Sequence, residues 1–523
     1  VKFYMTPLGY TYLNQYYNLL LPKLDVEVYQ DPQADTEKLI SYGASKRKII
    51  PGTRKQAETP FEHMVSAIKY QGIRLHFFSA MFQKVDVNAL TAFIADKPNS
   101  KYNRVIWYLY EWLTEKTLDL NDLTQGNYIQ LFEDDFYYTL ANGDKEKRTR
   151  VINNAIGTKD FCPTIRKTKE VKVLEDIDVY QTAYAEMQKV GDLLTADVLG
   201  RSINYLYTKE TKSSNEIERE TPVKHKMKRF LNVIKNVGLF ELTKEKLIDL
   251  QNKIVEEDKR ANDYRTDEIY VGSTIHRLGG IDENVHYIGA LAKHVPSIMH
   301  GLLKTHERLM IDAKIPALIH ATAISFGEVY IHPFVDGNGR IHRYLIHDVM
   351  KQREPEHKFI IPISAAILKN QKQYDSVLET ISRPILAMLD WELDSENNNK
   401  LIVHNDIDYM YRYPDYTEHV KFVYDMMTKA ISDELVEEIG LLVVFDAIKS
   451  AINNLTDIPN NTLDKITSII INGGGKVSKA KHKLVVSHIE QGKLTIIEEL
   501  SVKLIQTMKA RINIDVQQLM DKK

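Results

Sequence analysis

Along most of this chain, apolar residues recur every three or four positions, which is the spacing of one face of an α-helix. The run over residues 105–113 is typical, and few segments show the two-residue alternation of a strand. The clearest exception covers residues 265–272, where alternation and β-branched side chains indicate a strand or one arm of a hairpin. We therefore predict an all-α, multidomain protein with one short β-hairpin.

Chain length and two polar breaks indicate three domains. The 523 residues exceed what one hydrophobic core usually serves. Pro163 and the charged stretch 166–172 form a first connector, and the polar run 394–399 forms a second break. We predict an amino-terminal helical domain over residues 1–165, a central domain over 166–395 and a carboxy-terminal helical domain over 396–523.

Composition argues against several classes of protein. A chain with 43% hydrophobic and 27% charged residues and a formal net charge of −2 gives no reason for wholesale attraction to nucleic acid or an anionic membrane. Cys162 is the single cysteine, so we expect a buried structural thiol and a reducing compartment. We find no run of about 18 apolar residues and no signal peptide at the visible start. We expect a cytoplasmic protein without a membrane partner, although the start at Val1 leaves an amino-terminal address open.

A Gly-Asn-Gly turn followed by two arginines has the residue types of a phosphate site. Gly337, Asn338 and Gly339 tolerate positive φ, which lets backbone N–H groups converge on an anion. A helical pattern follows at once, so the turn lies at a helix amino terminus, where the macrodipole favours phosphate. Arg340 and Arg343 are three residues apart and bring two guanidinium groups to one face of that helix. The segment predicts a polyphosphate site.

Two side chains before the turn complete a catalytic set. Asp336 offers a carboxylate that suits Mg²⁺, because this ion commonly takes one carboxylate with phosphate oxygens and waters. His332 offers an imidazole that can take the proton of an attacking hydroxyl while the metal and the arginines hold a leaving pyrophosphate. Either His-Pro or Gly-Asn-Gly alone would indicate a plain turn. We expect His342 and His347 to be surface or packing residues, because no carboxylate pattern completes a metal site with them.

The twelve residues from His332 to Arg343, HPFVDGNGRIHR, resemble the Fic family signature HPFx[DE]GNGRxxR at every position usually required. The resemblance extends over about residues 176–393 and implies a central, all-helical Fic core. It also implies a transferase that uses ATP and Mg²⁺ to place AMP on a serine, threonine or tyrosine hydroxyl of a target protein. Within it, the signature's histidine, carboxylate and Gly-Asn-Gly-Arg residues would serve as base, metal ligand and nucleotide site.

Two other segments resemble further parts of Fic proteins. The strand-like residues 265–272 resemble the flap, a hairpin that pairs with the backbone of the target as an added strand. The resemblance makes Thr266, Ile269 and Val271 the docking residues of that flap. It also makes Tyr374 a candidate to line the adenine pocket.

Residues 213–219 resemble the inhibitory motif [ST]xxxE[GN] of Fic proteins, with Ser214 and Glu218 in the key positions. The amino-terminal position of the motif implies a class II member. In such a protein Glu218 pairs with Arg343 and denies the γ-phosphate of ATP its guanidinium partner. The same glutamate can position a water that removes AMP from the modified protein.

The inhibitory motif has one departure and one rival. Arg219 stands where glycine or asparagine is usual, so we expect the helix to end differently. Glu216 is a rival candidate, but the spacing favours the glutamate two residues later. The alternative without any inhibitory role is a capping box on a surface helix.

Three hypotheses for function stay open. The leading one is an autoinhibited adenylyltransferase of bacterial type, in the cytoplasm or delivered to a host cell, with self-modification expected and homodimer formation open. The second is a nucleotide-sensing regulator that binds DNA or protein through the basic residues 473–483, although a solvated turn is favoured there and nucleic acid is not the favoured partner. The third keeps the fold but uses another donor, such as UMP, phosphocholine or phosphate.

Overall fold

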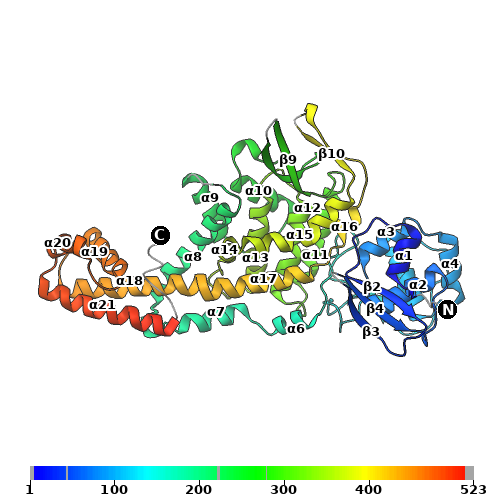
Figure 1. Cartoon of the computed structure of the whole chain (residues 1–523), viewed down its shortest axis with the longest axis horizontal. Coiled ribbons are helices and arrows are strands. Elements are labelled where there is room, and N and C mark those ends of the chain that lie inside the picture. The colour runs from blue at the N-terminus through cyan, green and yellow to red at the C-terminus, as the bar shows by residue number, and fades with distance from the viewer. Residues whose placement is uncertain (1–4, 43–44, 221–223, 278–279, 398, 513–523) are drawn as a thin grey trace. The chain divides into compact units, whose positions relative to one another are not determined.

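A computed structural model describes residues 5–42, 45–220, 224–277, 280–397 and 399–512 (Figure 1). Within this described part the protein is mainly helical with small sheets, which confirms the predicted fold class. The chain divides into two units, each built from three separate stretches. The first unit consists of Val1–Val171, Phe240–Ile346 and Asp375–Val420, and the second of Lys172–Leu239, His347–Tyr374 and Lys421–Lys523.

The first unit begins with a mixed sheet and helices that pack around it. The sheet has the order β1-β2-β4-β3, with β2 and β4 parallel and the other pairs antiparallel. Leu8, Val28 and Ile50 form a buried cluster at this sheet. These elements are β1 (Thr6–Pro7), α1 (Tyr10–Tyr17), β2 (Val26–Asp31), β3 (Lys38–Tyr42), β4 (Ser45–Pro51), α2 (Pro60–Gln71), α3 (Leu75–Phe82), α4 (Val87–Asp96) and α5 (Lys101–Thr114).

The strands of this sheet were not predicted, because β4 reads Ser-Lys-Arg-Lys-Ile-Ile-Pro and lacks a two-residue alternation. A second sheet, with the order β5-β7-β6, follows α5 and consists of β5 (Ile129–Gln130), β6 (Asp144–Glu146) and β7 (Val151–Asn153). Both sheets lie within residues 1–165, for which a helical domain was predicted.

The rest of the first unit surrounds one fully buried helix. Every residue of α12 (Ala317–Ile331) is buried, so this helix forms the centre of the core. The predicted boundary at residue 395 falls between β10 and β11, two strands that pair with each other. The surrounding elements are α10 (Lys244–Ile254), η2 (Glu257–Lys259), β8 (Tyr270–Arg277), β9 (Gly280–Ile288), α11 (Val295–Met310), β10 (Trp391–Asp394), η3 (Ser395–Asn397), β11 (Lys400–Val403) and α16 (Asp408–Arg412).

Residues 157–163 fasten α11 and α12 to each other. Phe161 is fully buried against Gly301 of α11 and Gly327 of α12. A Cβ at these glycines would lie 2.6 Å from the Phe161 nitrogen and 2.5 Å from its ring, so only glycine leaves room for this packing. Burial raises the pKa of the neighbouring Cys162 thiol to about 12, which confirms a structural thiol.

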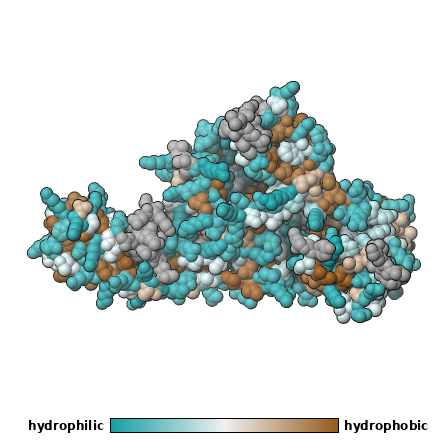
Figure 2. Space-filling model, viewed as in Figure 1, coloured by the Kyte–Doolittle hydropathy of each residue, from teal (hydrophilic) through white to brown (hydrophobic). Residues whose placement is uncertain are grey.

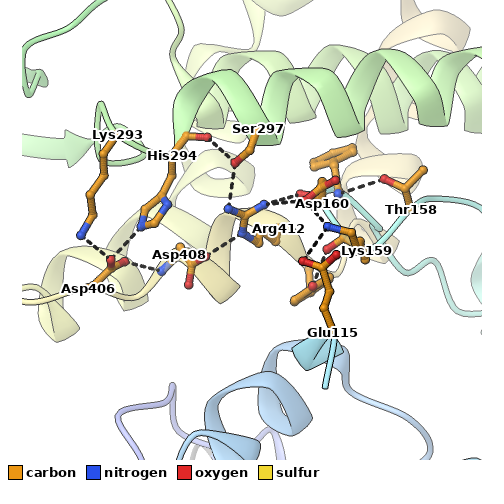
Figure 3. Close-up of polar contacts among 12 residues, drawn as sticks. Glu115, Thr158, Lys159, Asp160, Lys293, His294, Ser297, Asp406, Asp408 and Arg412 are labelled. Carbon is orange, nitrogen blue, oxygen red and sulfur yellow. Dashed lines mark hydrogen bonds and ion pairs between the residues drawn. The ribbon is translucent and has the colours of Figure 1, made fainter. Parts of the chain in front are cut away.

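Polar contacts tie the same segment to α11 and α16 (Figure 3). The guanidinium of Arg412 donates to Asp408 at 2.6 Å, to the Asp160 carbonyl at 3.2 Å and to the Ser297 hydroxyl at 2.9 Å. Only 13% of the Arg412 side chain is exposed, so this cation is held by its partners rather than by water. The contacts join α16 to Ser297 of α11 and to residues 157–163.

A second ion-pair group in Figure 3 lies just before α11. Lys293 and His294 contact the Asp406 carboxylate at 2.8 and 2.7 Å. Partial burial alone would raise the pKa of Asp406, but the hydrogen bonds and charges of His294 and Lys293 outweigh it and hold that pKa well below its usual range. Asp406 is therefore charged at neutral pH.

The second unit is built around α8 (Ala196–Ile217), which packs against α9, α14 and α18. Lys209 of α8 pairs with Glu434 at 2.6 Å and with Glu438 at 3.0 Å. The other elements that lie wholly in this unit are α7 (Val179–Gln188), η1 (Gly191–Leu193), α9 (Lys224–Lys235), α14 (Ile363–Lys369), the π-turn η4 (Ala430–Leu435), α18 (Val436–Leu455), α19 (Asn460–Asn472), α20 (Lys479–Val486) and α21 (Gln491–Ile512). Helices α6 (Lys169–Glu175), α13 (Asn338–Arg353), α15 (Gln371–Met388) and α17 (Thr417–Lys429) contain residues of both units.

The visible face of the molecule is mostly hydrophilic, with hydrophobic residues in small separate patches (Figure 2). Among the helices of the described residues, none combines the length and the apolar character that crossing a bilayer requires.

Candidate active site

His332 ends the central helix in a conformation that orients its ring. Its backbone N–H donates to the Glu328 carbonyl at 2.9 Å, and its φ of 57° lies in the left-handed region. Pro333 follows and cannot continue the helix. The Nδ1 of His332 lies 3.0 Å from the Val329 carbonyl oxygen, which can only accept. Nδ1 is therefore the donor, and in the neutral ring Nε2 carries the lone pair that can accept a proton.

Arg265 clamps the backbone around His332. It is buried, and its Nε donates to the His332 carbonyl at 2.7 Å. Its Nη2 donates to the carbonyls of Ala290 and Ile331, and its backbone N–H donates to the Pro333 carbonyl at 2.9 Å. One buried guanidinium thus binds the backbone at Ile331 and His332. The sequence indicates Arg265 only as the first residue of the flap, because backbone carbonyls are present at every residue and form no sequence pattern.

The loop before α13 is held by Asn338. Its Nδ2 donates to the Phe334 carbonyl at 2.8 Å, and its Oδ1 accepts from the Phe334 N–H at 3.1 Å. Asn338 and Gly339 already belong to α13, and among the three turn residues only Gly337 has a positive φ, at 96°. The helix therefore begins one residue after Gly337, earlier than the predicted turn over residues 337–339 implies. The amino terminus of α13 still presents its first N–H groups beside the loop.

Asp336 lies between two cations. Arg340 donates to its Oδ1 at 3.0 Å, and the Lys259 ammonium lies 3.0 Å from its Oδ2. Burial alone would raise the pKa of Asp336, but the hydrogen bond of Lys259 and the charges of Lys259 and Arg340 outweigh it and lower that pKa below its ordinary value. The carboxylate is therefore charged, as a metal ligand must be.

The residues present fit a magnesium ion that is held mainly through a nucleotide. The described residues contain no group of three or more His, Cys, Asp or Glu side chains arranged to hold a metal. Asp336 supplies one charged carboxylate at the amino terminus of α13. One carboxylate with phosphate oxygens and waters is a common set of ligands for Mg²⁺.

Arg340 and Arg343 are each 1% exposed, on successive turns of α13. Two buried guanidinium groups beside a helix amino terminus concentrate positive charge there. The structure thus brings His332, Asp336, Arg340 and Arg343 together within the loop and first turns of one helix, in the first unit.

Two signature-helix histidines have packing roles. His342 is fully buried against the Phe326 ring, with centroids 4.4 Å apart, and burial lowers its pKa to about 3. His347 is 2% exposed and lies 3.0 Å from Glu210 within the second unit. His342 and His347 were predicted to be surface or packing residues, and their burial shows that both are packing residues.

The predicted flap is a hairpin that begins later than expected. Strand β8 starts at Tyr270 and pairs antiparallel with β9. Val271 lies in β8 and is 42% exposed, whereas Thr266 and Ile269 precede the strand. The Ile269 carbonyl still accepts from the Gly289 N–H at 3.1 Å, which extends the pairing by one residue. The role of these three residues in docking stays a prediction.

Ser214 and Glu218 lie at the end of α8 in the second unit. Ser214 is buried in the last turns, and Glu218 is the exposed C-cap. Arg219 has a φ of 56°, and the N–H groups of Arg219 and Glu220 bond to the carbonyls of Glu216 and Asn215. This is a Schellman ending, so arginine takes the left-handed position that glycine usually fills. The capping-box alternative is wrong, because such a box lies at a helix amino terminus.

Tyr374 also lies in the second unit. It is 6% exposed and stacks on Phe422, with ring centroids 5.7 Å apart. The predicted pairing of Glu218 with Arg343 and the predicted place of Tyr374 at the adenine both join residues of the two units. Both stay predictions.

Comparison with known proteins gives one family match and distant solved structures. Residues 241–350 match the model of the Fic/DOC family. One similar solved structure is a Fic-domain-containing signalling protein from Bacteroides thetaiotaomicron, 16% identical over 50% of this chain and 97% of that chain, with a TM-score of 0.32. Another is a Fic family protein from Desulfovibrio desulfuricans, 15% identical over 66% and 90%, with a TM-score of 0.31. No curated protein matches the chain.

Because these TM-scores are low, the assignment depends on the family model and on the intact signature that it covers. The chain therefore contains a Fic/DOC-family domain over residues 241–350. Fic proteins generally transfer nucleotide-containing or phosphate-containing groups.

Proposed function

We propose that this protein is an adenylyltransferase that moves AMP from Mg·ATP to a serine, threonine or tyrosine hydroxyl of a target protein. The observation that carries the proposal is the contact of His332 Nδ1 with the Val329 carbonyl. This contact leaves Nε2 as the proton acceptor, a few residues from a cationic helix amino terminus.

In the proposed step, Nε2 of His332 accepts the proton of the target hydroxyl. The hydroxyl oxygen forms a bond to the α-phosphorus of ATP, and the bond from that phosphorus to the bridging oxygen of the β-phosphate breaks. AMP stays on the target, and pyrophosphate leaves with the bridging oxygen. Arg340, Arg343 and the N–H groups of Gly339 and its neighbours at the start of α13 would bind the phosphates. A bound Mg²⁺, held by Asp336, would supply further charge neutralisation for the leaving group.

Regulation by Glu218 is part of the same proposal. Its carboxylate would pair with Arg343 in the resting protein and so hold ATP in an unproductive pose. The same carboxylate could orient a water that removes AMP from a modified target. Support comes from the position of Glu218 as the C-cap of α8, followed by a left-handed residue, as the motif's usual glycine or asparagine would be.

A protein presenting a hydroxyl side chain is the proposed partner, and self-modification and homodimer formation belong to the proposal as well. The flap would receive an extended segment of the target along β8. UMP, phosphocholine or phosphate as the transferred group are the alternatives that keep the same site.

A second candidate function is nucleotide-regulated DNA binding. Lys476, Lys479, Lys481 and Lys483 are all exposed at the start of α20 and in the turn before it. A basic face of this kind could contact phosphates. A gel-shift titration of the whole protein with duplex DNA tests this candidate, and steeply salt-dependent binding would support it. Absence of binding at low salt would remove it.

Intact-mass spectrometry tests the adenylyltransferase proposal. The wild-type protein and His332→Ala are incubated with ATP and Mg²⁺, alone and with a cell extract as a source of targets. The proposal expects added AMP on the protein itself or on an extract protein with wild type and not with His332→Ala. A phosphate adduct instead would indicate phosphoryl transfer from ATP, and a UMP adduct that forms only when UTP replaces ATP would indicate the other nucleotide donor.

A further inference from the structure

Asp336 has a cation on each of its carboxylate oxygens, and the two cations differ in kind. Arg340 lies in the first turn of α13, four residues after Asp336, is 1% exposed and contacts Oδ1 at 3.0 Å. Lys259 comes from η2 and contacts Oδ2 at 3.0 Å, with 51% of its side chain exposed. An arginine buried in the first turn of α13 is fixed, whereas a half-exposed lysine on a four-carbon stem can move away.

The backbone of Lys259 is fastened to the signature loop by Gln251. The Nε2 of this fully buried side chain donates to the Lys259 carbonyl at 2.9 Å and to the Asp336 carbonyl at 3.1 Å. Its Oε1 accepts from the Ala261 N–H at 3.1 Å. The Gln251 amide thus joins the backbone of Lys259 to that of Asp336. Because this link holds the backbone, the Lys259 side chain can move away from Asp336 while the backbone of residue 259 stays in place.

We propose that Lys259 is a displaceable cation that occupies the metal-binding oxygen of Asp336 in the nucleotide-free protein and swings away when Mg·nucleotide binds. The inference rests on the proposed function, because it assigns a regulator to the same site. Lys259 keeps the negative charge of Asp336 compensated in the resting state. It also raises the Mg²⁺ concentration that the site requires, because an ammonium 3.0 Å from Oδ2 repels a divalent cation at the same oxygen.

The first test measures the Mg²⁺ requirement of nucleotide binding. Affinity for α,β-methylene-ATP, whose α–β link resists cleavage, is measured by titration calorimetry at a series of Mg²⁺ concentrations. Lys259→Met removes the charge and keeps most of the stem. Lys253→Met is the matched control, because Lys253 is 50% exposed and pairs with Asp249 of its own helix at 2.6 Å.

Lys259→Met should lower the Mg²⁺ concentration at half-maximal affinity by about two- to fivefold, the range expected for a half-exposed ion pair. Lys253→Met should leave it unchanged. If wild type binds the nucleotide with Mg²⁺ and both variants share its midpoint, or if Lys259→Met raises the midpoint, the inference is overturned. If wild type shows no Mg²⁺-dependent binding at all, the proposed function fails first.

A second test needs no nucleotide. Lys259→Glu places a carboxylate where the ammonium lay, beside Asp336. The inference predicts that this variant binds Mn²⁺ alone at least tenfold more tightly than wild type, as followed by the loss of the free Mn²⁺ electron-spin-resonance signal. The double variant Lys259→Glu/Asp336→Asn should lose that gain. Equal Mn²⁺ binding by wild type and Lys259→Glu would show that Lys259 does not face the metal position.

Discussion

The Nδ1 of His332 lies 3.0 Å from the carbonyl oxygen of Val329, in the last turn of the helix that His332 ends. This contact fixes which ring nitrogen carries the hydrogen in the neutral imidazole. The other nitrogen, Nε2, is then the base, and it needs no further residue to set its tautomer.

The role of His332 predicts a separation of chemistry from binding. His332→Ala should lower AMP transfer by about 10²-fold or more, because general-base catalysis contributes that much. Affinity for α,β-methylene-ATP should stay within about twofold of wild type, since the ring acts on the hydroxyl. His300→Ala, which changes an exposed histidine on α11, is the control for both measurements. Equal losses of rate and affinity would make His332 a structural residue.

The Arg265 clamp predicts a loss of both stability and activity. Arg265→Lys keeps the charge but cannot reach the carbonyls of Ala290, Ile331 and His332 at once. Hydrogen bonds to a charged group contribute about 1.5–3 kcal/mol each, so the free energy of unfolding should fall by about 3 kcal/mol.

The same variant should lower AMP transfer by about tenfold or more, because the loop that carries His332 loses its support. Urea unfolding and a transfer assay provide the measurements. Arg260→Lys is the control, because Arg260 is 38% exposed and its Nε donates to a single carbonyl, that of Asn252. A folded Arg265→Lys with wild-type stability would refute the clamp.

His332 and Arg265 show where sequence analysis succeeds and where it fails. His332 was predicted because its partners in chemistry lie within twelve positions of it and form a specific pattern. Arg265 and Gln251 were missed because they act on backbone carbonyls, which every residue has. The ion pair of Lys259 was missed because its partner lies 77 positions away, and no pattern in one sequence links the two.

The same distinction applies to the fold, where helices were predicted but strands and long-range packing were not. Long amphipathic helices such as α8 have a periodicity that can be recognised in the sequence without knowing which elements pack against them. The early strands were missed because β4 pairs a charged half with an apolar half and shows no alternation. The packing of Phe161 on Gly301 and Gly327 depends on helices that meet only in the folded chain.

Glu328 predicts a specific dependence of stability on pH. Both of its carboxylate oxygens lack a hydrogen-bond partner among the described residues, and burial raises its pKa well above the ordinary value. The folded state therefore keeps a proton that the unfolded state releases above about pH 4.3. The stabilising contribution is complete below that pH and falls as pH rises towards the folded-state pKa.

Glu328→Gln should remove this dependence, because glutamine does not titrate. Above pH 5, the free energy of unfolding of the variant should fall less with pH than that of wild type, by up to about 1.4 kcal/mol per pH unit. Urea unfolding at pH 5, 6, 7 and 8 provides the slopes. Glu307→Gln, at an exposed position on α11, should keep the wild-type slope. Parallel slopes for wild type and Glu328→Gln would show that Glu328 is ionised in the fold.

The inhibitory role of Glu218 predicts opposite changes in two reactions. Glu218→Gly should raise AMP transfer, because Arg343 becomes available to the γ-phosphate and ATP can take the productive pose. If Glu218 also positions water, the same variant should lose removal of AMP from a pre-modified target. Two time courses, one for label gained and one for label lost, measure both reactions. Glu216→Ala is the control on the same helix, and an unchanged rate of gain in Glu218→Gly would reduce Glu218 to a helix C-cap.

The central claim is that the protein transfers AMP through His332, and the position of a radioactive label tests it most directly. Wild type, Glu218→Gly and Glu218→Gly/His332→Ala are incubated with Mg²⁺ and with ATP labelled either at the α-phosphate or at the γ-phosphate. The account predicts protein-bound α-label and no γ-label for Glu218→Gly, less α-label for wild type, and none for the double variant. Protein-bound γ-label, or equal α-label with and without His332, would contradict it.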